Sequence, residues 1–398
     1  MTRAFRTPQT ALAVIMLCGL ISCAHVEPIP DRAMEFEEGI RVLASNLAQQ
    51  MEGSGVGTLV NKVLIDPLTK PSKKIVIDPF IDLESGYPLK ISTKISEIIS
   101  KELSGKFVVL GELEPETLQA AQYIMNGMVT VYDKQKNIYK VQATVFDKTS
   151  GKILASAFVR ISGFDTTPKE IYKDSPVFLK GESYKHYTAS VKKAPGETVD
   201  KEYFDGLAAK AMKTKGDSLY EQKDYDNSLA YYNKAAAIQQ GQQLEILNGQ
   251  FTNYRAQGRL AEAEEAYKNL LRISVVETGE IESKIIFGPG LKEPVESNAS
   301  LYNIYVRQIA NFVAAVPRCQ LKIVGHCSKT GSEAYNDKLS QERALWIQKQ
   351  MSAYAPQITS KSTAIGRGFH ENIVGTGRDD VTDQVDRRVE FVFMDCVE

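Results

Sequence analysis

Alternating hydrophobic and polar positions predict a compact α/β domain over residues 34–163. The clearest pattern lies at 139–159, where alternation on both sides of a turn at 147–151 predicts an antiparallel hairpin with one buried face. Isoleucines spaced three or four residues apart in 89–103 predict a helix. Short apolar runs predict three further strands, at 75–77, 108–110 and 123–132.

A strand, a turn-rich loop and a helix are predicted in succession between residues 321 and 347. Apolar residues at 321–324 indicate a short buried strand, and a loop follows at 327–332. Leu339, Arg343 and Ile347 are four residues apart, which puts them along one side of a helix. We take this strand–loop–helix unit as the part of the chain that carries its most specific motif.

The motif residues of this unit match the signature of the OmpA-like peptidoglycan-binding domain. That signature runs Gly-His-Thr-Asp, then Asn-x-x-Leu-Ser-x-x-Arg-Ala, Gly-x-Gly and Asn-Arg-Arg-Val-Glu. The chain matches it at Gly325, His326, Asn336, Leu339, Ser340, Arg343, Ala344, Gly366, Gly368, Arg387, Arg388, Val389 and Glu390. Residues 280–398 therefore resemble an OmpA-like βαβαβ sandwich, and the resemblance implies that they bind peptidoglycan.

One position of the signature differs in its charge. The family has an aspartate fifteen residues before the helix arginine; it receives the ammonium of the diaminopimelate stem, while the arginine holds a carboxylate. Ser328 stands there in this chain. Serine supplies no opposite charge, which would cost about 1–3 kcal/mol of binding unless Asp337 or Glu333 compensates. The resemblance implies a binding set of Arg343, Asn336, Leu339, Ser328 and Arg387.

The resemblance also bears on the cysteines of this segment. In the family's sheet the last strand runs against the second, so Cys319 and Cys396 would meet at neighbouring strand ends. A disulfide between them is one prediction, and free thiols are the alternative. Cys327 would stay outside such a bond. We predict no metal site, because the three cysteines lack close ligand pairing.

The first 22 residues have the pattern of a secretory signal. Arg3 and Arg6 precede an apolar run at 11–20, which is too short to span a bilayer. Leu20-Ile21-Ser22-Cys23 resembles a bacterial lipobox, which implies a lipidated Cys23 in the outer membrane, facing the periplasm. An ordinary signal with an incidental cysteine is the alternative. Residues 23–33 are expected to be a tether.

Three further segments complete the predicted organisation. The α/β domain resembles the domain shared by the lipoproteins FlgO and CsgG and the N-terminal domain of TolB, through 75–80, 126–131 and the turn 147–152. This implies a role in outer-membrane assemblies, although an unrelated secreted α/β domain could share the hairpin. The Pro- and Lys-rich segment 164–200 is expected to be a linker with little core.

Residues 201–274 contain an internal repeat. Leu219, Lys223, Tyr225, Ser228 and Tyr232 recur thirty-five residues later as Tyr254, Gly258, Leu260, Ala263 and Tyr267. The period resembles tetratricopeptide repeats, pairs of antiparallel helices. Such repeats generally bind proteins, so protein partners are one expectation, and a structural spacer is the other. Two repeats are fewer than independent stability usually needs, so a neighbouring element must cap them.

Composition and motifs argue against catalysis and against nucleic acid. Hydrophobic residues make up 43%, charged residues 24%, and the net charge is -1, so no strong field attracts nucleic acid. None of the four histidines pairs with a serine or cysteine at recognisable spacing. Gly366-Arg367-Gly368 lacks the third glycine of a phosphate loop. We therefore predict no catalytic residues and no cofactor.

The sequence as a whole predicts a multidomain α+β lipoprotein. The α/β domain, the helical repeats and the OmpA-like domain would link an outer-membrane assembly to peptidoglycan without catalysis. The alternative is a periplasmic protein-interaction scaffold whose OmpA-like domain no longer binds peptidoglycan, because Ser328 replaces the family aspartate.

Overall fold

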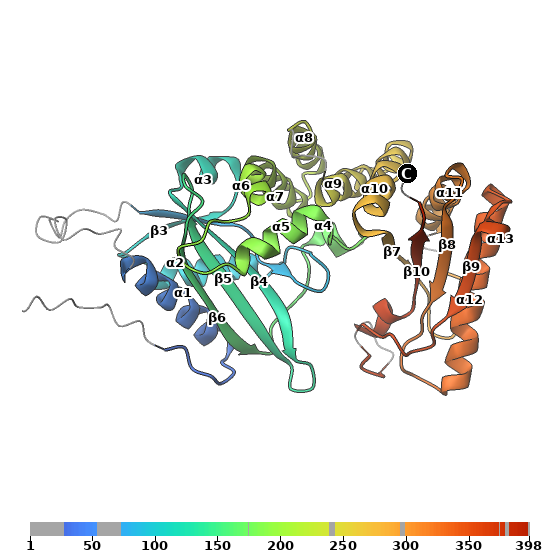
Figure 1. Cartoon of the computed structure of the whole chain (residues 1–398), viewed down its shortest axis with the longest axis horizontal. Helices are drawn as coiled ribbons and strands as arrows, with labels where there is room; N and C mark the ends of the chain where they lie inside the picture. Colours follow the sequence, from blue (N-terminus) through green and yellow to red (C-terminus); the bar gives the residue numbers. More distant parts are fainter. Residues whose placement is uncertain are drawn as a thin grey trace, which may run out of the picture.

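The computed structural model describes residues 28–53, 73–173, 175–238, 243–294, 299–373, 375–378 and 382–396. Within these residues, two sheet domains lie at opposite ends of the molecule and a row of helices joins them (Figure 1). The predicted mixed α+β class is confirmed. The predicted signal peptide and Cys23 lie outside the described residues. Among the helices that the structure describes, none combines the length and hydropathy needed to cross a bilayer.

The N-terminal domain is built on a mixed sheet in the order β3-β1-β4-β5-β6, with the short β2 paired to β4. The strands are β1 (Lys74–Ile77), β2 (Ile81–Asp82), β3 (Val108–Glu112), β4 (Tyr123–Asp133), β5 (Ile138–Asp147) and β6 (Ile153–Ser162). β1 runs parallel to β3 and β4, whereas β4, β5 and β6 are antiparallel. The predicted hairpin is β5–β6, and its turn closes through the Gly151 amide, 2.8 Å from the Asp147 carbonyl oxygen.

Both faces of this sheet are covered, as β1 illustrates. Ile75 and Ile77 belong to a core with α1 (Phe36–Gly53) and α2 (Ser92–Glu102). Val76, between them, belongs to a second core with residues of α5 (Glu182–Val191) and α6 (Lys201–Asp205). A strand that is buried on both faces has a continuous apolar run rather than an alternating one, which explains Ile75-Val76-Ile77.

The prediction that 164–200 is a linker with little core is wrong. The segment contains α5 and the short α4 (Glu170–Lys173), and Tyr172 and Tyr187 are fully or almost fully buried. The Tyr187 hydroxyl donates to the Gly127 carbonyl oxygen at 2.8 Å and fixes α5 against the sheet. Its core residues are too widely spaced to give a hydrophobic period, so only contacts with distant parts of the chain make the segment a core element.

Helices connect this domain to the C-terminal one. They are α6, α7 (Leu207–Glu221), α8 (Tyr225–Ala236), α9 (Leu244–Ala256) and α10 (Leu260–Thr278); the short α3 (Pro115–Ala120) instead belongs to the N-terminal domain, between β3 and β4. α7 packs with α8, and α9 with α10. Equivalent repeat positions behave alike: Tyr232 and Tyr267 are fully buried, and Lys223 and Gly258 both have left-handed φ, 62° and 71°. Each repeat unit is thus one helical hairpin, α7–α8 or α9–α10. Its likeness to tetratricopeptide repeats stays a prediction.

The C-terminal domain is a four-stranded sheet in the order β7-β10-β8-β9. Its elements are β7 (Glu280–Ile286), α11 (Ala299–Ala315), β8 (Gln320–Gly325), α12 (Glu333–Tyr354), α13 (Ile358–Lys361), β9 (Ser362–Gly366), the 3-10 helix η2 (Thr382–Asp386) and β10 (Arg388–Met394). β10 runs antiparallel to β7 and β8, and β8 parallel to β9. Cys319 and Cys396, at the ends of β8 and β10, form a disulfide with Cα atoms 4.2 Å apart.

The helical hairpins and the C-terminal domain share one hydrophobic core. The Tyr267 ring on α10 packs on the Tyr305 ring on α11, with centroids 4.6 Å apart. Beside them, Arg307 Nε donates to Glu264 Oε1 at 2.7 Å. The C-terminal domain therefore covers the end of the helical repeats at α10. An array of only two repeats needs such a cap for its stability.

Candidate functional site

The signature glycines let α12 lie directly on the sheet. A Cβ atom at Gly325, the last residue of β8, would lie 2.1 Å from the Ser340 carbonyl oxygen. At Gly366, the last residue of β9, it would lie 2.6 Å from the Gln341 amide nitrogen. Only glycine tolerates such close backbone approach. The two glycines thus fix the height of α12 above β8 and β9, and with it the position of Arg343.

Arg343 is fully buried, and each of its three nitrogens donates to a backbone carbonyl. Nε donates to Leu291 at 2.9 Å, Nη1 to His326 at 2.8 Å and Nη2 to Gly288 at 3.0 Å. The guanidinium also lies over the Phe287 ring, 5.0 Å from its centroid. Arg343 therefore holds residues 287–294, the described part of the loop between β7 and α11, against α12. We call this segment the 287–294 loop.

The other predicted binding residues surround Arg343 in different roles. Asn336 is buried, and its Nδ2 donates to the Thr330 carbonyl oxygen at 2.9 Å, which shapes the loop before α12. Arg387 Nε donates to the Phe287 carbonyl oxygen at 3.1 Å. Ser328 is 5% exposed. Leu339 lines a cavity. The structure thus gathers these five residues in one region, with hydrogen bonds that tie together the chain segments around it.

His326 and Cys327 point to different neighbours. His326 Nε2 lies 3.2 Å from Glu390 Oε2, and Arg388 also pairs with Glu390. Burial acts to raise the pKa of Glu390, but the close approach of the His326 imidazole and the charge of Arg388 outweigh it and lower the pKa to about 2. Cys327 Sγ instead lies 3.4 Å from Arg343 Nη1. This divergence excludes a histidine–cysteine pair of the nucleophile–base kind.

Glu333 and Asp337, the expected compensating charges, both lie beside His370. Their carboxylates lie 3.4 Å and 3.6 Å from His370 Nε2. The three side chains are exposed, and their ligand atoms lie within 4.8 Å of one another. This spacing is compatible with one divalent cation, although exposed carboxylates commonly gather around a histidine without a metal.

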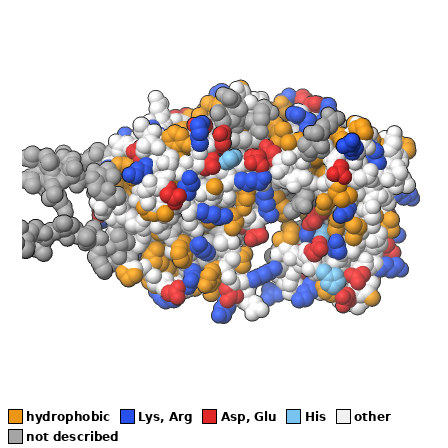
Figure 2. All heavy atoms as spheres, viewed as in Figure 1, with side chains coloured by type: hydrophobic (Ala, Val, Ile, Leu, Met, Phe, Trp, Pro, Cys, Tyr) orange, Lys and Arg blue, Asp and Glu red, His pale blue; other side chains and the backbone are white. Residues whose placement is uncertain are grey.

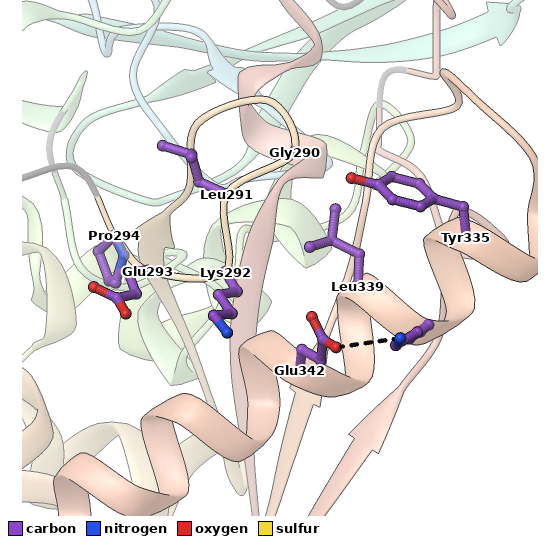
Figure 3. A pocket seen from close by; sticks show the side chains of 9 residues that line it. Gly290, Leu291, Lys292, Glu293, Pro294, Tyr335, Leu339 and Glu342 are labelled. Atoms are coloured by element: carbon purple, nitrogen blue, oxygen red, sulfur yellow. Dashed lines mark ion pairs between the residues drawn. The ribbon is translucent and has the colours of Figure 1, made fainter.

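A cavity of about 810 Å³ opens between the 287–294 loop and α12 (Figure 3). The loop contributes Gly290, Leu291, Lys292, Glu293 and Pro294, and the helix contributes Tyr335, Lys338, Leu339 and Glu342. Leu291 and Leu339 give it apolar walls, and two cations and two carboxylates surround them. Small-molecule sites typically have volumes of roughly 300–1,000 Å³ with a few polar groups in such walls.

The loop side of this cavity was not predicted from the sequence. Gly288-Pro289-Gly290 predicts a turn after a strand, but nothing in the sequence indicates that this turn folds back onto Arg343. Glu342 lies one residue before the signature arginine, so its helix position could have been inferred from the periodicity. Lys292 had no comparable signal.

A second cavity, of about 480 Å³, lies between the two sheet domains. Lys134 and Lys180 line it on one side, and Asn372 and Arg388 on the other. Lys134 Nζ bridges the gap to the Ile373 carbonyl oxygen at 3.0 Å. On the face in Figure 2, a hollow separates the two domains, and charges of both signs are interspersed without a broad basic patch.

The helical hairpins present a further candidate surface, which the chain itself occupies. α4 packs against α7 and α9. The Tyr172 hydroxyl donates to Asp217 Oδ1 on α7 at 2.9 Å, and the Ser175 hydroxyl donates to Asn248 Oδ1 on α9 at 2.8 Å. The expected protein partner therefore has no access to this part of α7 and α9 while α4 and Ser175 lie there.

Comparison with known proteins bears on the C-terminal domain. No family model matches the chain. Outer membrane porin F of Pseudomonas fluorescens is 36% identical over 89 residues, which are 21% of this chain and 26% of that protein. This similarity agrees with the resemblance that the signature residues carry. The C-terminal domain is OmpA-like. The chain matches only about a quarter of that relative's length.

Several solved structures are similar to part of the chain. The peptidoglycan-associated lipoprotein of Burkholderia pseudomallei is 18% identical, with 28% of this chain and 89% of that chain covered and a TM-score of 0.24. The C-terminal domain of Helicobacter pylori MotB is 17% identical, with 28% of this chain and 84% of that chain covered and a TM-score of 0.24. The LpoB C-terminal domain of Salmonella enterica is 12% identical, with 32% of this chain and 97% of that chain covered and a TM-score of 0.20. The FlgO, CsgG and TolB resemblance stays a prediction.

Proposed function

We propose that this protein is a non-catalytic cell-envelope protein that associates with peptidoglycan through its OmpA-like domain. The observation that carries the proposal is the cavity of about 810 Å³ on α12, the helix with the family's signature residues. The cavity combines apolar walls with charges of both signs, which suits a peptide that bears ammonium and carboxylate groups. The match to a protein named for the outer membrane supports an envelope location.

The rest of the chain fits a linking role. Lipidation of Cys23 would anchor the N-terminus in the outer membrane, since two or more acyl chains are enough for stable anchoring. The OmpA-like domain would then bind peptidoglycan. The N-terminal domain would lie between the outer membrane and the peptidoglycan and would contact an envelope assembly. The helical hairpins, which share a core with the C-terminal domain, would act as the connection.

A second function is favoured by one specific observation. Arg343, which would hold the stem carboxylate, donates from every nitrogen to a backbone carbonyl, and Ser328 has no charge for the ammonium. On this basis the chain would be a periplasmic protein-interaction scaffold whose OmpA-like domain no longer binds the wall.

Co-sedimentation with purified sacculi that contain diaminopimelate separates the two functions. The full chain in mild detergent should pellet with the sacculi in a saturable manner. Failure of the wild-type protein to pellet, together with pelleting of Ser328→Asp, would favour the scaffold. Membrane fractionation of Cys23→Ala tests the anchor, because loss of membrane retention is expected only if Cys23 is lipidated.

A further inference from the structure

One face of the N-terminal sheet is covered over only part of its length. Phe146 of β5 lies in a core with residues of α5 and α6. Further along the same face of the strand, Gln142 donates from Nε2 to the carbonyl oxygen of Val191, the last residue of α5, at 3.0 Å. Phe158, opposite Gln142 on β6, is 44% exposed. The helix therefore ends at Gln142, and the part of this face nearest the β4–β5 turn is open to solvent.

The open part of this face carries two cations side by side. Lys140 of β5 and Arg160 of β6 are directly opposite each other in the antiparallel pair. Lys140 Nζ lies 4.6 Å from the centroid of the Phe158 ring, and Arg160 Cζ lies 4.4 Å from that of Tyr132, which is also exposed. We call these four residues the cation–aromatic patch. Like charges directly opposite each other destabilise a sheet, so an anion between Lys140 and Arg160 is favoured.

The chain itself supplies little negative charge to this patch. Within the described residues, Lys140 has no carboxylate partner, and neither has Lys192, which directly follows α5. Arg160 pairs with Asp31, but the Asp31 side chain is 94% exposed. Ion pairs with so exposed a partner are weak, and an external anion can replace the carboxylate. The patch therefore suits an anionic partner that also accommodates two exposed aromatic rings.

The beginning of the described chain lies beside the patch and indicates which anions are near. Met34 bridges to Ile161 at the outer edge of β6 (Figure 1). Arg160 Nη1 also donates to the backbone carbonyl oxygen of Asp31 at 2.8 Å. Only eight residues lead from Cys23 to Asp31, and eight residues span at most about 29 Å. With the proposed acyl chains on Cys23, lipid headgroups are held within this distance, at a high effective concentration.

We propose that the cation–aromatic patch contacts the periplasmic surface of the outer membrane. Lys140 and Arg160 bind lipid phosphates there, and Phe158 and Tyr132 lie among the headgroups, the layer that aromatic side chains prefer. Acyl chains on a tether hold the N-terminal domain near the membrane but do not orient it, whereas this second contact fixes which side of the domain faces the lipid. The choice of the membrane as the partner rests on the proposed anchor at Cys23.

Vesicle flotation tests the patch without the acyl chains. The full mature chain with Cys23→Ala should float with vesicles of equal parts phosphatidylglycerol and phosphatidylcholine, and much less with phosphatidylcholine alone. Adding Lys140→Gln should lower the partition coefficient about fivefold, the contribution of one cation near an anionic surface. Lys94→Gln is the matched control, because Lys94 is 55% exposed and also lies over an aromatic ring, that of Phe36, at 5.4 Å. It should float like the parent protein.

Fluorescence reports whether the aromatic residues meet the lipid. Trp346 is the single tryptophan, so Phe158→Trp in a Trp346→Phe background places the only indole in the patch. Its emission should shift to shorter wavelength when the phosphatidylglycerol vesicles are added. Tyr335→Trp in the same background, at a residue that is 53% exposed on α12, should not shift.

Three results would overturn the proposal. They are no flotation of the parent protein, equal flotation of the Lys140→Gln and Lys94→Gln variants, and binding to soluble polyglutamate without binding to vesicles, which would indicate an acidic protein partner instead. None of them decides whether Cys23 is lipidated. High salt screens the patch but not acyl chains, so membrane fractionation of Cys23→Ala in high salt tests the anchor separately.

Discussion

Arg343 Nη2 donates to the carbonyl oxygen of Gly288, 3.0 Å away, across 55 residues of sequence. With the bond from Nε to the Leu291 carbonyl oxygen at 2.9 Å, it fastens the 287–294 loop to α12. The loop in turn forms one wall of the cavity that we assign to the stem peptide. A residue that the sequence marks as a ligand contact thus serves, in this structure, to hold the fold of the site.

Replacing this arginine should destabilise the C-terminal domain. Arg343→Ala leaves three backbone carbonyls without their donor, and we expect the free energy of unfolding to fall by about 3 kcal/mol. Trp346, the single tryptophan, lies on α12, so its fluorescence during urea titration reports on this domain. Arg367→Ala removes an arginine that is about half exposed and should change the same quantity by less than about 0.5 kcal/mol. Equal effects of the two variants would contradict the role of Arg343.

Glu390 should contribute a pH-dependent part of the stability. Its pKa is lowered to about 2, so its contribution is fully present above the ordinary pKa near 4.5 and is lost as the pH falls through 2. The shift corresponds to about 3 kcal/mol. Glu390→Gln should therefore destabilise the domain at pH 7 more than near pH 2. An equal loss of stability at both pH values, measured by urea unfolding, would refute this coupling to His326 and Arg388.

The disulfide between Cys319 and Cys396 joins the ends of β8 and β10 across 77 residues. Restricting an unfolded loop of that length stabilises the folded state by about 4 kcal/mol in the chain-entropy account. The double variant Cys319→Ser with Cys396→Ser should lower the free energy of unfolding by a comparable amount. Peptide mapping of denatured, unreduced protein checks the bond itself. Recovery of both cysteines as alkylated thiols would show that the bond does not form.

Tyr172 should report on the docking of the 164–200 segment. Its hydroxyl donates to Asp217, which is fully buried beside Lys213 with a 3.0 Å ion pair. Tyr172→Phe removes one donor to a buried carboxylate and should cost about 1–3 kcal/mol in thermal or urea unfolding. Tyr132→Phe, at a tyrosine that is 53% exposed, is the matched control. If Tyr172→Phe costs no more than the control, the segment does not dock as described.

Local pattern was sufficient for most of the fold. The hairpin β5–β6 followed from strict alternation, and α12 from the spacing of Leu339, Arg343 and Ile347, because these elements bury one regular face. The segment 164–200 could not be predicted in the same way. Tyr172 and Tyr187 are buried by contacts with residues 45 and 60 positions away, and no local period records such contacts.

The candidate site was predictable only on its helix side. Gly325, Gly366 and Arg343 are in the positions that the family signature implied. The opposing wall comes from a loop that the sequence shows only as a turn at 288–290. Its approach to Arg343 depends on hydrogen bonds between residues 52 and 55 positions apart, so the burial of Arg343 and the place of Lys292 on the cavity wall required the structure.

Association of the OmpA-like domain with the peptidoglycan stem can be measured directly by equilibrium dialysis of the full chain in mild detergent against a radiolabelled stem tripeptide. We predict saturable binding of about one diaminopimelate tripeptide per chain, with much weaker binding of the tripeptide that carries lysine. Retention of neither peptide by a protein whose Trp346 fluorescence reports a folded C-terminal domain would contradict the account and leave the scaffold function in its place.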